Sequence, residues 1–196
     1  MSSDRRRLTP SHSERILPRC SMNPNSAKLM VAVADHSVCV KINGRADFTS
    51  SVDLKKLITE LWQRGYNRFV FELCDCVMMD STFLGMLSGI GLKLSDAGSP
   101  QGSSLELLNP SPRIAEVLEN LGVEHLFCIT SGASPVTSHF EPLAKGCGES
   151  RAEIARTCLE AHKTLMEIKP ENAGKFKDVA QFLAEDLQRL EMAEKK

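Results

Sequence analysis

The residues with the clearest capacity for chemistry are Asp80 and Ser81, which stand between two apolar stretches. The run 69–73, Phe-Val-Phe-Glu-Leu, is rich in residues that favour β-structure and predicts a buried strand. Residues 84–94 predict a helix. The oxygens of Asp80 and Ser81 can accept backbone N–H groups of its first turn. A phosphate would also be tolerated there, because the helix dipole and the free amides favour negative charge. This arrangement suits a phosphorylation switch, although capping alone also explains it.

The elements that must position this serine follow one another in a regular order. Strand-like stretches alternate with stretches of helical period. One helical stretch begins at Ser51 and ends at Gly65, which is placed as its C-cap. A further helix begins at Ser111 and Pro112 and ends at Gly122. The expected strands lie at 29–33, 38–42, 68–74, 105–108 and 126–129, with His36 in the first turn and His125 at the start of the last strand. This order predicts an α/β fold with a mixed sheet and helices largely on one face.

Three further segments lie outside this alternation. Residues 1–27 have no hydrophobic period and carry Arg5, Arg6 and Arg7, which predicts a disordered tail. Residues 132–148 contain several glycines and prolines and predict a linker. Residues 149–196 form two amphipathic stripes and predict an α-helical hairpin. His162 on the first stripe is interpreted as an interface histidine rather than a catalyst.

Composition narrows the class of function. Of 196 residues, 24 are basic and 25 acidic, so electrostatics give no reason to expect a nucleic-acid or membrane-surface partner. No apolar run reaches the roughly 20 residues that span a bilayer, and the N-terminus lacks the apolar core of a secretory signal. The seven cysteines lack metal-like pairs apart from Cys74 and Cys76, which no nearby histidine complements. We therefore expect reduced thiols, a cytoplasmic location, and neither a metal nor a cofactor.

Catalytic signatures are also missing. The chain has no glycine-rich phosphate loop with lysine, no His-Glu-x-x-His and no Gly-x-Ser-x-Gly. Ser81 has no histidine close to it in sequence to act as a base. A binding module is therefore a better interpretation than an enzyme.

Residues 79–85, Met-Asp-Ser-Thr-Phe-Leu-Gly, resemble the Met-Asp-Ser-Ser/Thr-Gly-Leu-Gly signature of the STAS family, which includes anti-sigma factor antagonists and cytoplasmic domains of sulfate transporters. The resemblance extends over residues 28–131. It includes an expected turn at residues 44–47 after a strand, and the strand and helix around residues 109–123. It implies the same α/β fold, a STAS-like mixed sheet with helices largely on one face.

The resemblance also implies a function. In antagonists of this family the serine after the aspartate is phosphorylated by a partner that is both kinase and anti-sigma factor, and a cognate phosphatase removes the phosphate. That serine is Ser81 here. The implied partner-binding residues are Asp47, Phe48, Met79, Asp80, Thr82 and Phe83. A phosphate adds a charge of about −1.5 to −2 near two aspartates, which would oppose close packing of a partner.

Two features depart from the family pattern. Phe83 replaces the usual glycine, and it either contacts a partner or packs in the core. The hairpin at 149–196 lies outside the resemblance, and we expect it to be a regulatory or dimerising appendage, with self-association as one of its uses. The rival function is a STAS scaffold that works without phosphorylation, or an accessory subunit of a lipid- or anion-transport assembly.

Overall fold

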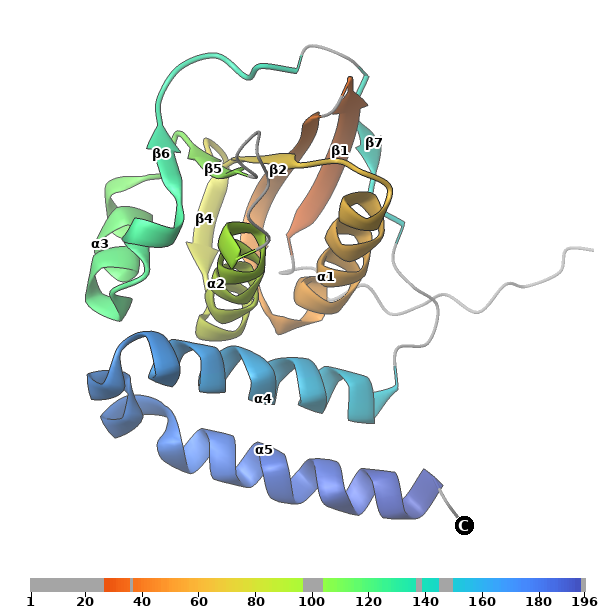
Figure 1. Ribbon diagram of the computed structural model, residues 1–196, viewed down its shortest axis with the longest axis vertical. Coiled ribbons are helices and arrows are strands. Elements are labelled where there is room, and N and C mark those ends of the chain that lie inside the picture. Colours follow the sequence, from red (N-terminus) through yellow and green to blue (C-terminus); the bar gives the residue numbers. More distant parts are fainter. Residues whose placement is uncertain (1–26, 36, 97–103, 137–138, 145–149, 195–196) are drawn as a thin grey trace, which may run out of the picture.

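The computed structural model describes residues 27–35, 37–96, 104–136, 139–144 and 150–194. The expected tail at 1–27, apart from its last residue, lies outside this part of the chain, and so does His36. The described residues form a sheet with helices packed in layers below it (Figure 1). The α/β fold with a mixed sheet expected from the sequence is confirmed.

The sheet has the strand order β6-β5-β3-β2-β1-β7, and β4 pairs with the end of β2. The strands β2, β3, β5 and β6 are parallel to one another, whereas β1 pairs antiparallel with β2, and β7 pairs antiparallel with β1 at the edge. The strand bounds are β1 Lys28–Ala34, β2 Ser37–Ala46, β3 Arg68–Glu72, β4 Cys76–Met79, β5 Ser104–Leu108, β6 Cys128–Thr130 and β7 Glu141–Pro142.

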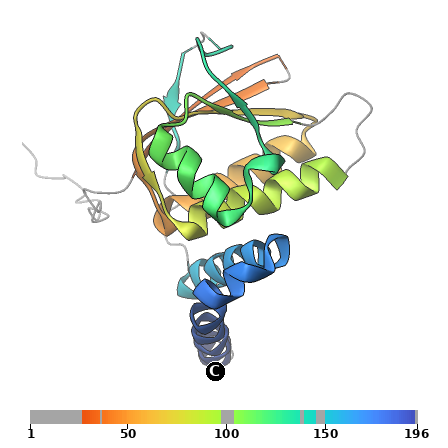
Figure 2. The same ribbon diagram turned by 90° about the vertical axis from the view of Figure 1, so that its left-hand side faces the viewer.

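The helices lie on one face of the sheet in successive layers (Figure 2). Nearest the sheet are α1 (Phe48–Gln63), α2 (Ser81–Asp96) and α3 (Pro112–Leu121). The next helix, α4 (Arg151–Ile168), crosses α1 and α2, and α5 (Ala173–Glu194) packs antiparallel on its outer side. Two short 3-10 helices complete the described elements, η1 (Glu124–Leu126) and η2 (Pro170–Asn172).

Apolar side chains form two cores on the two faces of the sheet. The larger core fills the space between the sheet and the helices, where Phe69, Phe71 and Leu87 are fully buried. The smaller core lies on the opposite face around Cys39 and is covered by Val136. Because α4 contributes the fully buried Leu165 to the larger core, the hairpin packs against its own domain.

Several local expectations were wrong. Residues 44–46 form no turn, because they continue β2 and pair with β4 across a bulge between Gly44 and Arg45. His125 lies in η1 and not in a strand, which begins only at Cys128. The strand expected at 68–74 ends at Glu72, so Cys74 is exposed after β3, and Cys76 is buried at the start of β4.

The segment at 132–148, expected as a linker, includes the short strand β7, which pairs with β1. Two residues are too few to show a strand period, so no local pattern indicates this strand. In the described part of the chain, no helix is both long and apolar enough to cross a membrane.

Candidate functional site

The site lies where β2 and β4 end side by side. These strands are parallel, and their last residues, Ala46 and Met79, are register partners. The residue after each strand is an aspartate that begins a helix, Asp47 before α1 and Asp80 before α2. Parallel pairing of the strands therefore places the N-termini of two helices next to each other.

Asp80 joins these two helix starts through its carboxylate. Oδ1 accepts a hydrogen bond from the backbone N–H of Phe83 at 2.8 Å, which caps α2. Oδ2 accepts one from the backbone N–H of Phe48 at 3.0 Å, in the first turn of α1. Asp80 therefore has the capping role expected from the sequence. Its side chain also holds the first turn of α1 next to the first turn of α2, where Ser81 lies.

Asp47 caps α1 in a similar way. Its Oδ1 accepts from the backbone N–H of Thr49 at 3.1 Å and from the Thr49 hydroxyl at 2.5 Å. The Ser50 hydroxyl lies 3.3 Å from the backbone N–H of Asp47, which completes a capping box. The two open interpretations of Asp47 were a cap and a partner contact. The structure places it as the cap, and its role toward a partner stays a prediction.

Burial raises the pKa of the Asp80 carboxyl above its ordinary value of 3.8, and the negative charge of Asp47 acts in the same direction. The backbone N–H groups of Phe83 and Phe48 lower it and only partly offset the loss of hydration. The folded protein therefore binds this proton more tightly than the unfolded chain does.

This shift has a consequence for stability. Because the pKa of this acid is higher in the folded protein than in the unfolded chain, proton binding stabilises the fold at low pH. This stability is lost as the pH rises from 3.8 through the raised pKa. We expect the free energy of unfolding of the wild type, relative to Asp80→Asn, to fall as the pH rises above 3.8 through the raised pKa of Asp80. Urea unfolding of both proteins measures this difference. A difference that stays constant or grows with pH would contradict the shift.

Ser81 contacts a histidine from the C-terminal hairpin. Its Oγ lies 3.1 Å from Nε2 of His162 on α4. The other ring nitrogen, Nδ1, lies 2.8 Å from the backbone carbonyl oxygen of Cys158. A carbonyl can only accept, so Nδ1 carries a hydrogen, and in the neutral ring Nε2 accepts the hydrogen bond from the Ser81 hydroxyl. The serine is therefore held by a ring in one tautomer.

The His162 ring is almost fully enclosed, with 6% of the residue exposed. The Phe176 ring of α5 covers it, with ring centroids 5.1 Å apart and planes tilted by 56°. Sequence reasoning assigned His162 to an interface but did not bring it to Ser81, because the two are 81 positions apart. The position of His162 on an apolar helical stripe was the available signal, and it did not reveal which surface the stripe covers.

The contact between α2 and α4 continues beyond this pair. The Thr82 side chain hydrogen-bonds the Cys158 thiol, whose pKa is raised chiefly by burial. One turn further on, Gly85 lies directly against the backbone of Ala161, and a Cβ on Gly85 would overlap the carbonyl oxygen and Cα of that residue. The two helices are therefore in backbone contact close to Ser81.

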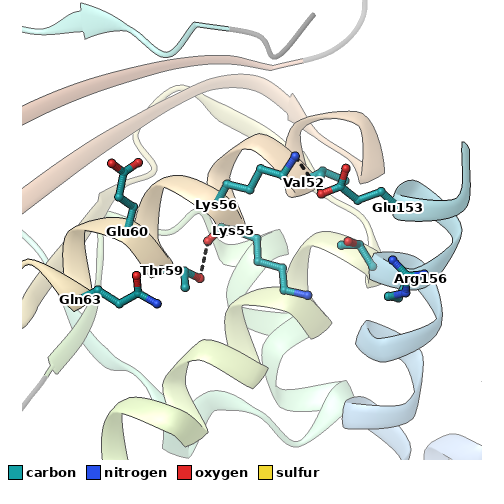
Figure 3. Close-up of a pocket in the computed structure, with 9 residues that line it drawn as sticks. Val52, Lys55, Lys56, Thr59, Glu60, Gln63, Glu153 and Arg156 are labelled. Carbon is teal, nitrogen blue, oxygen red and sulfur yellow. Dashed lines mark hydrogen bonds and ion pairs between the residues drawn. The ribbon is translucent and has the colours of Figure 1, made fainter. Parts of the chain in front are cut away.

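The seam between α1 and α4 is polar. Lys56 Nζ lies 2.8 Å from Glu153, as Figure 3 shows, and Lys55 Nζ lies 2.5 Å from Glu160. Lys55, Lys56 and Glu153 border an open pocket of about 360 Å³ between the helices. Its side chains have mixed charge, and the pocket lining is Val52, Lys55, Lys56, Thr59, Glu60, Gln63, Glu153, Arg156 and Thr157. Positive and negative groups pair across the seam, so the pocket does not favour an anionic or a cationic ligand.

The residues expected to bind a partner lie together, but they differ in exposure. Phe48 is 45% exposed, whereas Thr82 is 5% exposed and Met79 is buried. Phe83 is fully buried in the larger core, which corresponds to the second of its two open interpretations. The exposed Val77 on β4, absent from the expected set, adds apolar surface at this end of the molecule.

The described residues contain no group of three or more His, Cys, Asp or Glu side chains placed to hold a metal ion. Cys76, one of the two closely spaced cysteines, is buried, and burial raises the pKa of its thiol to about 11. A thiol with this pKa stays protonated near neutral pH and is a poor ligand and nucleophile.

A family model identifies the family of this chain. Residues 28–139 match the family model of the STAS domain, a match that extends past residue 131. A candidate anti-sigma factor antagonist from Thermotoga maritima is similar, with 21% identity, 52% of this chain and 85% of that chain covered, and a TM-score of 0.47. The Bacillus cell fate determinant SpoIIAA in its phosphorylated form is 20% identical, with 55% of this chain and 93% of that chain covered and a TM-score of 0.45. No curated protein sequence matches the chain.

Proposed function

The chain belongs to the STAS domain family, and on this premise we propose that it is a regulatory binding module of the anti-sigma factor antagonist type, switched by phosphorylation of Ser81. The partner is a protein that acts both as anti-sigma factor and as serine kinase, and a phosphatase reverses the modification. The proposed partner surface consists of Asp47, Phe48, Asp80 and Ser81 at the two helix starts, and the buried residues Met79, Thr82 and Phe83 of the expected set support it from below.

The observation that carries the proposal is the position of Ser81 at the first residue of α2, directly after its cap Asp80. A phosphoryl group on Oγ lies at the positive end of the helix, where the dipole stabilises negative charge. In the transfer, a γ-phosphoryl group of a nucleoside triphosphate bonds to Oγ, the hydroxyl loses its proton, and the diphosphate leaves. Ser81 is the hydroxyl that fits this step.

The charge of the phosphate explains how the switch acts on a partner. Asp80 and Asp47 already place two carboxylates at the helix starts, and each is held by backbone amides. A phosphate of about −2 beside them makes this surface strongly negative. A partner that packs closely there must remove water from these charges, so its affinity falls on phosphorylation.

The test is a pull-down from native extract of the source organism with the full chain as bait, supplied with nucleoside triphosphate and read by intact mass and fragmentation. We expect one added phosphate on Ser81, and we expect Ser81→Ala to abolish it. Ser81→Ala leaves His162 Nε2 without the Ser81 hydroxyl, which costs about 1–3 kcal/mol of stability. Ser88→Ala is the matched control, because Ser88 lies in the same helix and bonds only the Leu84 carbonyl oxygen. A phosphate on Thr82 would overturn the assignment, and an unmodified bait captured with transport subunits would favour the rival function.

A further inference from the structure

The hairpin of α4 and α5 covers the proposed phosphorylation site. Both ribbon views place α4 between α5 and the layer of α1 and α2 (Figure 1 and Figure 2). The ring of His162 occupies the space in front of the Ser81 hydroxyl, and Cys158 and Ala161 contact the next residues of α2. A kinase therefore meets α4 before it meets the serine.

We propose that the hairpin is an autoinhibitory element, docked over Ser81 in the resting protein and displaced when Ser81 carries a phosphate. Docking of α4 and phosphorylation of Ser81 exclude each other. The inference rests on the proposed function for the identity of the modification, and it adds the regulation of that site by a part of the chain outside the STAS match.

Steric reasons support this exclusion. A phosphoryl group places a phosphorus atom and three oxygens beyond Oγ, and the 3.1 Å between Oγ and His162 Nε2 leaves no room for them. The ring cannot turn aside easily, because Cys158 holds Nδ1 and Phe176 lies against its face. A tilt of α4 toward α2 at Gly85 cannot make space at Ser81 either, because the backbone of α4 already lies against Gly85. With the Ser81 side chain in this rotamer, a phosphoryl group on Oγ therefore requires α4 to move away from α2.

Hydrogen bonding also opposes docking of α4 on a phosphorylated Ser81. In the docked state Nε2 of His162 is an acceptor that needs the proton of the Ser81 hydroxyl. Phosphorylation removes that proton and replaces it with acceptor oxygens. A neutral ring would then face them with an unpaired acceptor, and a ring that binds a second proton would form an ion pair where only 6% of His162 is exposed. A buried acceptor without a donor is costly, and the cost is relieved when the helix leaves.

The contacts that hold α4 are of a kind that can release. On α2, the residues that face α4 include Gly85, Gly89 and the two hydroxyl residues Ser81 and Thr82, and Met86 and Ile90 line the groove between the two helices. The ion pairs toward α1 are partly exposed and therefore weak. The helix α5 packs mainly on α4, so both helices can leave as a unit.

A firmer attachment lies at the far end of the hairpin. Asn172 in η2 is fully buried, and its Nδ2 donates to the carbonyl oxygens of Leu121 and Leu165 at 3.0 and 2.9 Å. Lys169 Nζ lies 3.3 Å from the carbonyl oxygen of Asn120. The bonds to Leu121 and Asn120 fix the turn between α4 and α5 to the end of α3, and displacement must break them, whereas the bond to Leu165 lies within the hairpin.

Cys158 provides a direct readout of displacement. Its thiol is buried between α4 and α2, whereas the thiol of Cys39 is buried in the smaller core on the opposite face of the sheet. The test uses the full chain with phosphoserine installed at position 81 during translation, so that no kinase is required. Both thiols are labelled with N-ethylmaleimide under native conditions, and the labelling rates are measured by mass spectrometry of tryptic peptides.

We expect phosphoserine at position 81 to raise the labelling rate of Cys158 at least about tenfold while the rate of Cys39 stays within about twofold. An unchanged rate at Cys158 would overturn the inference, because the phosphate would then fit under a docked helix. A parallel rise at both thiols would overturn it too, since it would mean global unfolding. Because the phosphate is installed without a kinase, the proposed function fails separately, when native extract leaves Ser81 unmodified.

Discussion

Replacing Gly85 with alanine is expected to destabilise the protein by about 1–3 kcal/mol, whereas Gly89→Ala, one helical turn away, is expected to stabilise it by up to about 1 kcal/mol. Both substitutions exchange glycine for the best helix former in the interior of α2. They differ in what the new methyl group meets. At Gly85 it overlaps the backbone of Ala161, while at Gly89 it lies 3.7 Å from the Thr164 hydroxyl, an ordinary contact.

Urea unfolding of the two variants and the wild type measures this contrast. Because the overlap at Gly85 is with backbone atoms, a rotamer change cannot relieve it, and α4 must move away from α2. Amide hydrogen exchange along α4 should therefore be faster in Gly85→Ala than in Gly89→Ala. Equal stability of the two variants would show that α4 does not hold the close approach described here.

Removing residues 149–196 is expected to leave a folded STAS domain whose Ser81 is phosphorylated at least about tenfold faster than in the full chain, equivalent to ~1.4 kcal/mol of lost docking free energy. The core between the sheet and α1 to α3 contains Phe69, Phe71, Phe83 and Leu87, all fully buried and all retained. The truncation loses the fully buried Leu165 and the bonds of Asn172, so a lower stability than that of the full chain is also expected.

Circular dichroism and light scattering test the fold of the truncated chain, and phosphate incorporation in native extract tests the rate. The full chain with Ser88→Ala serves as a control that keeps the hairpin. A truncated chain that is unfolded or aggregated would make the hairpin part of the essential core and the boundary at 149 wrong. A folded truncation with an unchanged rate would mean that α4 does not limit access to Ser81.

The features that depend on local sequence were accessible before the structure. Three predictions that follow from neighbouring residues are confirmed. They are the cap at Asp80, the start of α3 at Pro112 with its end at Gly122, and the two amphipathic helices. The sheet could also be predicted in outline, because its long strands are apolar runs of sufficient length. Local chemistry alone determines these elements.

The features that the sequence did not reveal depend on distant partners. Residues 44–46 look like a turn, and only the pairing with β4 keeps them in β2. The contact of Ser81 with His162 requires α4 to cross α2, which no local pattern encodes. Phe83 departs from the family motif, and its burial depends on the packing of α2 against the sheet.

The short connection between β7 and α4 has a quantitative consequence for any external partner. Pairing of β7 with β1 fixes the chain at Pro142, and α4 begins soon afterwards at its cap Ser150. A helix tethered so closely competes for α2 at an effective concentration on the order of millimolar, whatever the concentration of the protein. A partner that needs the same surface therefore binds with its intrinsic affinity divided by the fraction of molecules that are open. Dilution does not change that fraction, so the sensitivity of the switch is set by the amino-acid sequence of the hairpin rather than by the amount of protein.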